Sequence, residues 1–271
     1  MIPLEFDRML KEILGSEKRK EHAISFLSYI LKRDKSEFKG IQFPKTELSI
    51  QRANQKRPLL DVVLALPDQM RVNIEIQVVK QPNIRQRTLY YASRLYGDQL
   101  NKGQNYDQLR QTISINILDF ILYDDEYPMH DSFVSDPVLG TVHSNDLRLI
   151  TLELPKRNNR VNIKERQLSR EARSWLGIIG AKDKEEFMAN ATFADTRKVW
   201  DDVEELSSSE DMIFAYAREH YANLNYNDDL RWAREEGLQQ KQLDIARAMN
   251  AEGMDPATIQ RFTGLTPDQL T

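Results

Sequence analysis

The chain has 271 residues, of which 40% are hydrophobic and 30% charged, enough apolar material for one large core or two small ones. It contains no cysteine, which excludes disulfides and thiolate metal sites and favours a reducing, cytoplasmic compartment. No apolar run approaches the roughly 18 residues of a membrane span. The first residues mix acids and bases with apolar residues, unlike a signal peptide. We therefore expect a soluble protein with no membrane partner.

Charge is unevenly distributed along the chain. The formal net charge of −4 taken alone argues against a nucleic-acid partner, because phosphate binding needs local positive charge. Segment 80–110, however, holds six bases against two acids, whereas segment 181–236 holds seven bases against fifteen acids. Such asymmetry indicates two regions with different roles, although two ordinary solvated helix faces would give the same pattern.

The N-terminal half predicts alternating helices and strands. Residues 5–32 carry apolar side chains at helical spacing, with a candidate break at Gly15 and Ser16. A strand with an irregularity at Pro44 follows over 38–50. Residues 58–66 and 71–79 are rich in Val, Ile and Leu, and the turn residues Pro67–Met70 between them predict a hairpin.

The second half of the chain completes the sheet and then changes character. Residues 84–101 predict a helix, and 112–123 and 147–154 predict two further strands. After Pro155 the chain predicts only helices. The fold class is therefore α/β (α+β): a mixed sheet flanked by helices and followed by an all-helical C-terminal region. The strands on either side of the helix over 84–101 are candidates for parallel pairing, because that helix is a crossover.

Two carboxylates occupy mirror positions on the predicted hairpin. Asp61 lies seven residues before Asp68 at the turn centre, and Glu75 lies seven residues after it. A symmetric hairpin places them opposite each other, and Gln77 shares their face because side chains alternate along a strand. Two facing acids repel, and a hard divalent cation would compensate them. The spacing leaves open a polar face whose acids meet Lys or Arg from elsewhere.

Several strings in the chain resemble those of the PD-(D/E)xK transposase-like nucleases, the recombination-promoting nuclease group. The hairpin contributes Asp61-Val62 and Asn73-Ile74-Glu75-Ile76-Gln77. Further similar segments follow at 87–91, 95–109, 115–120, 152–156 and 263–265. The resemblance implies a restriction-endonuclease-like mixed sheet. It also implies a metal-dependent DNA endonuclease that hydrolyses phosphodiester bonds and takes part in DNA recombination or transposition. The alternative is a non-catalytic DNA-binding or regulatory protein that retains the nuclease fold.

The resemblance also assigns roles to residues. It implies that Asp61 and Glu75 hold Mg²⁺ or Mn²⁺ together with the backbone carbonyl of Ile76. Gln77 would complete the catalytic set, but it stands where the family motif has lysine. Glutamine can orient a group by hydrogen bonds but carries no charge, so activation of water would be left to the metal.

Substrate contacts are expected from the basic segment. Lys80 lies at the entrance of the helix over 84–101, and Arg87 and Arg94 share one of its faces because they are seven residues apart. With Gln99 and Tyr91, these residues are the candidate DNA contacts. Packing of the tyrosine on the sheet is the alternative for Tyr91.

We divide the chain into a nuclease-like domain over 1–156, an acidic helical region over 157–236 and a helical tail over 237–271. In the tail, 228–252 predicts one long helix, and a short helix between Asp255 and Gly264 gives a helix-turn-helix-like pattern. Segment 254–271 has only one base, Arg261, which favours packing or homo-oligomerisation over DNA reading.

The remaining polar candidates show weaker patterns. The four histidines show no ligand spacing. The acidic run Asp124-Asp125-Glu126 predicts a solvated loop, with cation binding as the alternative.

Overall fold

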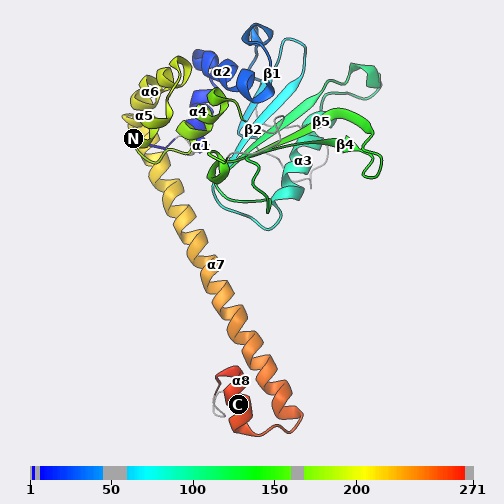
Figure 1. Cartoon of the computed structure of the whole chain (residues 1–271), viewed down its shortest axis with the longest axis vertical. Coiled ribbons are helices and arrows are strands. Elements are labelled where there is room, and N and C mark those ends of the chain that lie inside the picture. The colour runs from blue at the N-terminus through cyan, green and yellow to red at the C-terminus, as the bar shows by residue number, and fades with distance from the viewer. Residues whose placement is uncertain (1, 4–6, 45–59, 160–167, 266–271) are drawn as a thin grey trace. The chain divides into compact units, whose positions relative to one another are not determined.

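The computed structural model describes residues 2–3, 7–44, 60–159 and 168–265, and the part before residue 160 contains a five-stranded sheet (Figure 1). The strands run in the order β1-β2-β3-β5-β4. Their bounds are β1 Val62–Ala65, β2 Arg71–Gln77, β3 Thr112–Leu118, β4 Met129–Ser135 and β5 Val142–Glu153. The pairs β1–β2 and β4–β5 are antiparallel, whereas β2–β3 and β3–β5 are parallel. The predicted mixed sheet and the predicted parallel pair across the crossover helix are therefore confirmed.

The β1–β2 hairpin has the register that the symmetric spacing predicts. Val62 pairs with Ile74, which places Asp61 opposite Glu75. The turn closes with the amide of Leu66 donating to the carbonyl of Met70 at 2.9 Å. The strand of Asp61 is shorter than predicted, because regular pairing begins only at Val62.

Helix α3 (Ile84–Gly97) connects β2 to β3 and covers one face of the sheet (Figure 1). The register of the sheet places on this face a row of buried polar residues: Asn73, Glu75, Thr112, Ser114, Asn116, Thr151 and Glu153. A small apolar cluster of Leu60, Val63 and Leu95 fixes the helix against the hairpin. Leu60 lies on this face, although Val62 belongs to the main core on the other face, because the chain bends at Asp61.

The other face of the sheet is apolar and carries the main core. Helices that contribute buried residues to this core include α1 Asp7–Leu14, α2 Lys20–Leu31, α4 Arg170–Ile179, α5 Lys184–Asn190 and α6 Ala194–Ser207. Trp175 is fully buried, meets the Phe26 ring edge-on at 5.7 Å and donates to Ser25 Oγ at 3.0 Å. Arg19 and His22 of the N-terminal segment both bind Asp202, each at 2.7 Å. The acidic helices therefore complete the core that the N-terminal helices begin.

The contacts divide the chain at a different place from the sequence-based boundary at residue 156. They separate a unit over Met1–Tyr216 from a unit over Ala217–Thr271. The reason is that α4 to α6 share the core with α1 and α2, so the sheet and these helices form one unit.

The second unit contains most of α7 (Glu210–Ala251) and α8 (Pro256–Thr263). The helix predicted over 228–252 thus begins earlier, at Glu210. Asp255 caps α8 by accepting from the amide of Thr258, and Gly264 ends it with a φ of 74°. Ala246 and Ile259 are buried. In the described part of the chain, no helix is both long and apolar enough to cross a membrane.

Two expectations about strands differ from the structure. In the predicted strand over 38–50, Phe38 ends a short 3-10 helix (Lys35–Phe38) and Gln42 forms a single bridge with Ala65, while 45–50 lie outside the described residues. Strand β4 was not predicted. Its sequence lacks the run of β-branched residues that marks β2 and β3, and pairing with the long β5 is what makes it a strand.

Candidate functional site

The hairpin end of β1 and β2 brings the two predicted acids together through their own backbone. The amide of Asp61 donates to Glu75 Oε1 at 3.1 Å, and the amide of Ile76 donates to Asp61 Oδ2 at 3.2 Å. These two reciprocal bonds replace the strand pairing beyond Val62 and Ile74. Because the N–H and C=O of one residue in an extended strand point to the same edge, the carbonyl of Ile76 also faces Asp61.

Glu75 is a buried acid held in an unfavourable electrostatic setting. Its side chain is only 3% exposed, and Asn73 Nδ2 donates to Glu75 Oε1 at 3.3 Å. Burial and then the negative charge of Asp61 raise the pKa of Glu75 to about 8, although Arg87 opposes the shift. At neutral pH the pair would therefore retain a proton unless a further positive charge enters the site.

The donor set fits a hard divalent cation. Carboxylate and carbonyl oxygens are the ligands that Mg²⁺ accepts, usually one or two carboxylates with water completing the shell. Asp61 and Glu75 supply the carboxylates, and the carbonyl of Ile76 adds a neutral oxygen on the same side. A cation here would offset the repulsion that raises the pKa of Glu75.

Gln77 lies on the same face of β2 as Glu75, and its side chain accepts a hydrogen bond from Arg87. Arg87 Nη1 donates to Gln77 Oε1 at 3.1 Å, and Arg87 Nη2 lies 3.8 Å from Glu75 Oε2. The guanidinium carbon of Arg87 sits 5.2 Å from the centre of the Tyr91 ring, which itself packs on the cluster of Leu60, Val63 and Leu95. Arg87 therefore supplies positive charge next to Gln77, where the family motif has lysine.

The other predicted DNA contacts lie in α3 or next to its ends, and they already bind groups of the chain. Lys80 Nζ donates to the carbonyl of Ile121 at 2.7 Å. Arg94 Nη2 lies 3.4 Å from Asp98 Oδ1, and its side chain is 17% exposed. Gln99 Nε2 donates to Thr112 Oγ1 and to the carbonyl of Arg110, each at 2.9 Å, which ties the end of α3 to the start of β3. Of these three residues, only Lys80 is exposed.

Lys11 is a site residue that the sequence did not indicate. Its Nζ lies 3.3 Å from Asp61 Oδ1, and the residue lines a cavity of about 360 Å³ together with Asp61 and Glu12. Lys11 belongs to α1, fifty positions before Asp61 in the chain. No spacing rule connects such distant residues, so only the packing of α1 against the hairpin could reveal the contact.

A second polar cluster was also missed, because His130 was read as incidental and Asp125 as part of a solvated loop. Asp125, His130 and Glu153 offer ligand atoms that all lie within 4.8 Å of one another. However, Lys156 Nζ lies 2.9 Å from Glu153 Oε2 and 3.4 Å from Asp125 Oδ1. An ammonium thus already provides the positive charge that a metal would bring. Strand β4 had to be recognised before His130 could be placed here.

Comparisons with known proteins gave two family matches. The family described as PD-(D/E)XK nuclease family transposase matches residues 4–233. The Rpn/YhgA-like nuclease family, C-terminal HTH domain, matches residues 239–271. Neither the curated proteins nor the solved structures gave a match.

The second match bears on the tail, for which the low count of bases favoured a packing or oligomerisation role. The helix-turn-helix description instead points to DNA binding, and α7, α8 and the glycine that ends α8 agree with the helical pattern. With its first match spanning most of its length, the chain belongs to the PD-(D/E)XK nuclease family transposases, and its second match is a C-terminal helix-turn-helix domain of the Rpn/YhgA-like nucleases.

Proposed function

We propose that this protein is a divalent-metal-dependent DNA endonuclease that hydrolyses phosphodiester bonds. The observation that carries the proposal is the pairing of Asp61 with a buried Glu75 whose pKa is raised to about 8. Burying two facing acids is costly unless a counter-charge is present, and such arrangements are concentrated at functional sites. A link to DNA recombination or transposition follows from the family description.

In this proposal Asp61, Glu75 and the carbonyl of Ile76 hold Mg²⁺ or Mn²⁺. The bound ion would polarise the scissile phosphate and lower the pKa of a water ligand. Gln77 carries no charge, and its side-chain oxygen accepts from Arg87. We therefore propose that Gln77 orients the Arg87 side chain. Arg87 in turn contacts the negatively charged phosphate.

Lys11 adds a second positive charge, 3.3 Å from Asp61 Oδ1. Its ammonium lies on the wall of the cavity that contains Asp61, where it neutralises part of the charge of that acid. Substrate phosphate would enter a site that already carries two basic side chains, Lys11 and Arg87. This arrangement compensates for the negative charge of the two carboxylates during binding.

The test is the nicking of supercoiled plasmid DNA in Mg²⁺, Mn²⁺, Ca²⁺ or EDTA. We expect Mg²⁺ or Mn²⁺ to support cleavage by the wild type, and Asp61→Ala and Glu75→Ala each to abolish it. The control is Asp201→Ala, an exposed acid of α6. Circular dichroism melting shows whether the variants remain folded. Cleavage by either site variant at the wild-type rate would contradict the site assignment.

The helix-turn-helix match favours one rival, a non-catalytic DNA-binding or regulatory protein. The same assay separates the two. A wild-type protein that binds DNA but leaves the plasmid intact in every divalent cation would support the rival.

A further inference from the structure

We propose that the cavity between the start of α3 and the loop after β3 binds one phosphate group of the DNA. The cavity has a volume of about 570 Å³ and is lined by Lys80, Gln81, Pro82, Ile84, Arg85, Gln86 and Leu122. This inference rests on the proposed function in taking DNA as the ligand. It adds to that function a second contact with DNA, separate from Asp61 and Glu75.

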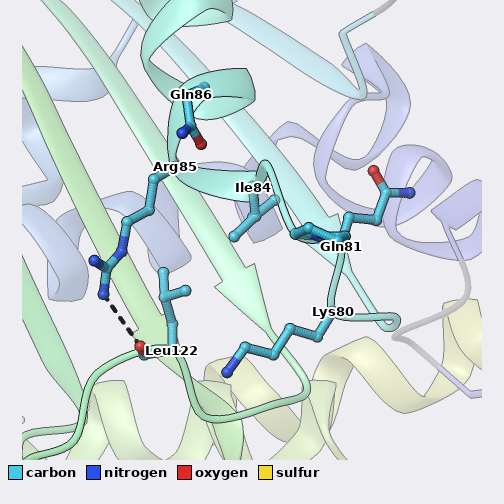
Figure 2. A pocket seen from close by; sticks show the side chains of 7 residues that line it. Lys80, Gln81, Ile84, Arg85, Gln86 and Leu122 are labelled. Carbon is cyan, nitrogen blue, oxygen red and sulfur yellow. Dashed lines mark hydrogen bonds between the residues drawn. The ribbon is translucent and has the colours of Figure 1, made fainter. Parts of the chain in front are cut away.

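Two cationic side chains converge on the cavity from different segments. Figure 2 shows Arg85 extending from α3 and Lys80 from the segment before it, with both charged ends directed towards the loop at Leu122. Arg85 Nη2 donates to the carbonyl of Leu122 at 3.3 Å, and Lys80 Nζ donates to the carbonyl of Ile121 at 2.7 Å. The loop carbonyls thus hold both cations at the cavity.

Neither cation is neutralised. Among the described residues, Lys80 and Arg85 form no ion pair with a carboxylate, and their polar partners are the neutral carbonyls of Ile121 and Leu122. Arg94 differs, because it pairs with Asp98. Both Lys80 and Arg85 are exposed, so an anion can reach them from solvent. Two uncompensated cations at one cavity match a phosphate group, which accepts several charge-assisted hydrogen bonds.

A fully buried carboxylate anchors the loop that carries Leu122. Glu153 is 0% exposed, and its Oε1 accepts from the amides of Leu122 and Tyr123. Lys156 completes the anchor, because its Nζ binds Glu153 Oε2 at 2.9 Å and the carbonyl of Tyr123 at 2.7 Å. The ring of Tyr123 in turn lies 4.9 Å from the guanidinium carbon of Arg85. The loop conformation is therefore fixed before DNA binds, which lowers the entropic cost of binding.

One side chain joins this cavity to the acids. Arg87 contacts Glu75 at 3.8 Å and also donates to Gln81 Oε1, on the cavity wall, at 3.4 Å. Lys80 follows Glu75 by five residues, which is at most about 18 Å of extended chain. Phosphates along one DNA strand are spaced about 3.4 Å per step along the helix axis, so the cavity lies within roughly five steps of the acids. A strand whose scissile phosphate meets the acids can place a neighbouring phosphate here.

The experiment measures the salt dependence of DNA binding for the full-length protein in Ca²⁺, without Mg²⁺ or Mn²⁺. The variants are Lys80→Gln, Arg85→Gln and the double variant, with Lys198→Gln as the control at an exposed lysine of α6. The DNA is one duplex prepared with 5′-hydroxyl ends and again with 5′-phosphate ends. We expect the double variant to lose roughly 0.9 in the slope of log affinity against log salt, the value for one phosphate.

If both cations bind one phosphate, the double variant should lose no more than about 0.9 in slope, whereas two separate phosphates would cost about 1.8. If the double variant loses slope on both duplexes, the bound group is an internal phosphodiester. If it loses slope only on the 5′-phosphorylated duplex, the bound group is a terminal phosphate. A double variant with the slope of Lys198→Gln on both duplexes overturns the inference. Because this assay needs no cleavage, a protein that binds DNA in this way but never cuts it would refute only the proposed endonuclease.

Discussion

Replacing Glu75 with Gln should change how the stability of the metal-free protein depends on pH. The pKa of Glu75 rises from 4.5 to about 8 in the folded protein, because of burial and the charge of Asp61. Between these two values the folded protein holds a proton that the unfolded chain has released. The free energy of unfolding must therefore fall as the pH rises from about 4.5 to about 8, and level off above that range.

The size of the effect follows from the proton count. At pH 6 to 7 the folded state is almost fully protonated at Glu75 and the unfolded state almost fully ionised. The wild type should then lose up to about 1.4 kcal/mol of unfolding free energy over that one pH unit. Gln cannot titrate, so Glu75→Gln lacks this contribution. Since Glu75 is only 3% exposed, solvent screening reduces the effect little.

Urea unfolding in EDTA at pH 6 and pH 7 measures the difference directly. The control is Glu21→Gln, which removes an exposed glutamate of α2. Adding Ca²⁺ at pH 8 should stabilise the wild type and Glu21→Gln, because the cation replaces the proton, but should stabilise Glu75→Gln much less. Parallel pH profiles for the wild type and Glu75→Gln would refute the argument that Glu75 is a buried, charge-frustrated acid.

Three further outcomes are expected. Arg87→Ala should lower the cleavage rate at saturating DNA roughly 10²-fold or more, the usual effect of losing one hydrogen-bond donor to the transition state. Arg87→Lys should retain more activity. Equal cleavage rates for the wild type and Arg87→Ala would show that this residue is not part of the site. Lys156→Met should lower the free energy of unfolding in urea by about 3–5 kcal/mol, because it leaves Glu153 buried without its counter-charge. Adding Glu153→Gln should restore part of that loss. A decrease below about 1 kcal/mol would contradict the role of this ion pair in anchoring the loop. Deletion of residues 239–271 should weaken DNA binding in gel-shift titrations but leave the single-turnover cleavage rate at saturating DNA unchanged, and unaltered affinity would argue against DNA binding by the helix-turn-helix domain.

The sequence by itself determined the fold class, the family and the facing of Asp61 and Glu75. The facing could be predicted because a hairpin is a local structure. The turn at Pro67–Met70 and the alternation of side chains fix which residues meet, and no distant segment is needed. The crossover helix and the parallel pairing of β2 with β3 followed from the same kind of short-range pattern.

Tertiary structure alone decided which distant side chains surround those acids. Lys11 reaches Asp61 because α1 packs on the hairpin. Glu153 anchors the loop at Leu122 because β5 lies beside β3. Strand β4 exists through its pairing with β5, although its own residues favour a strand only weakly. Such contacts join segments that are far apart in the chain, and their partners depend on how whole elements pack rather than on local spacing. The sequence could therefore predict the two acids and the basic residues Lys80 and Arg87, but not Lys11 or the cavities beside them.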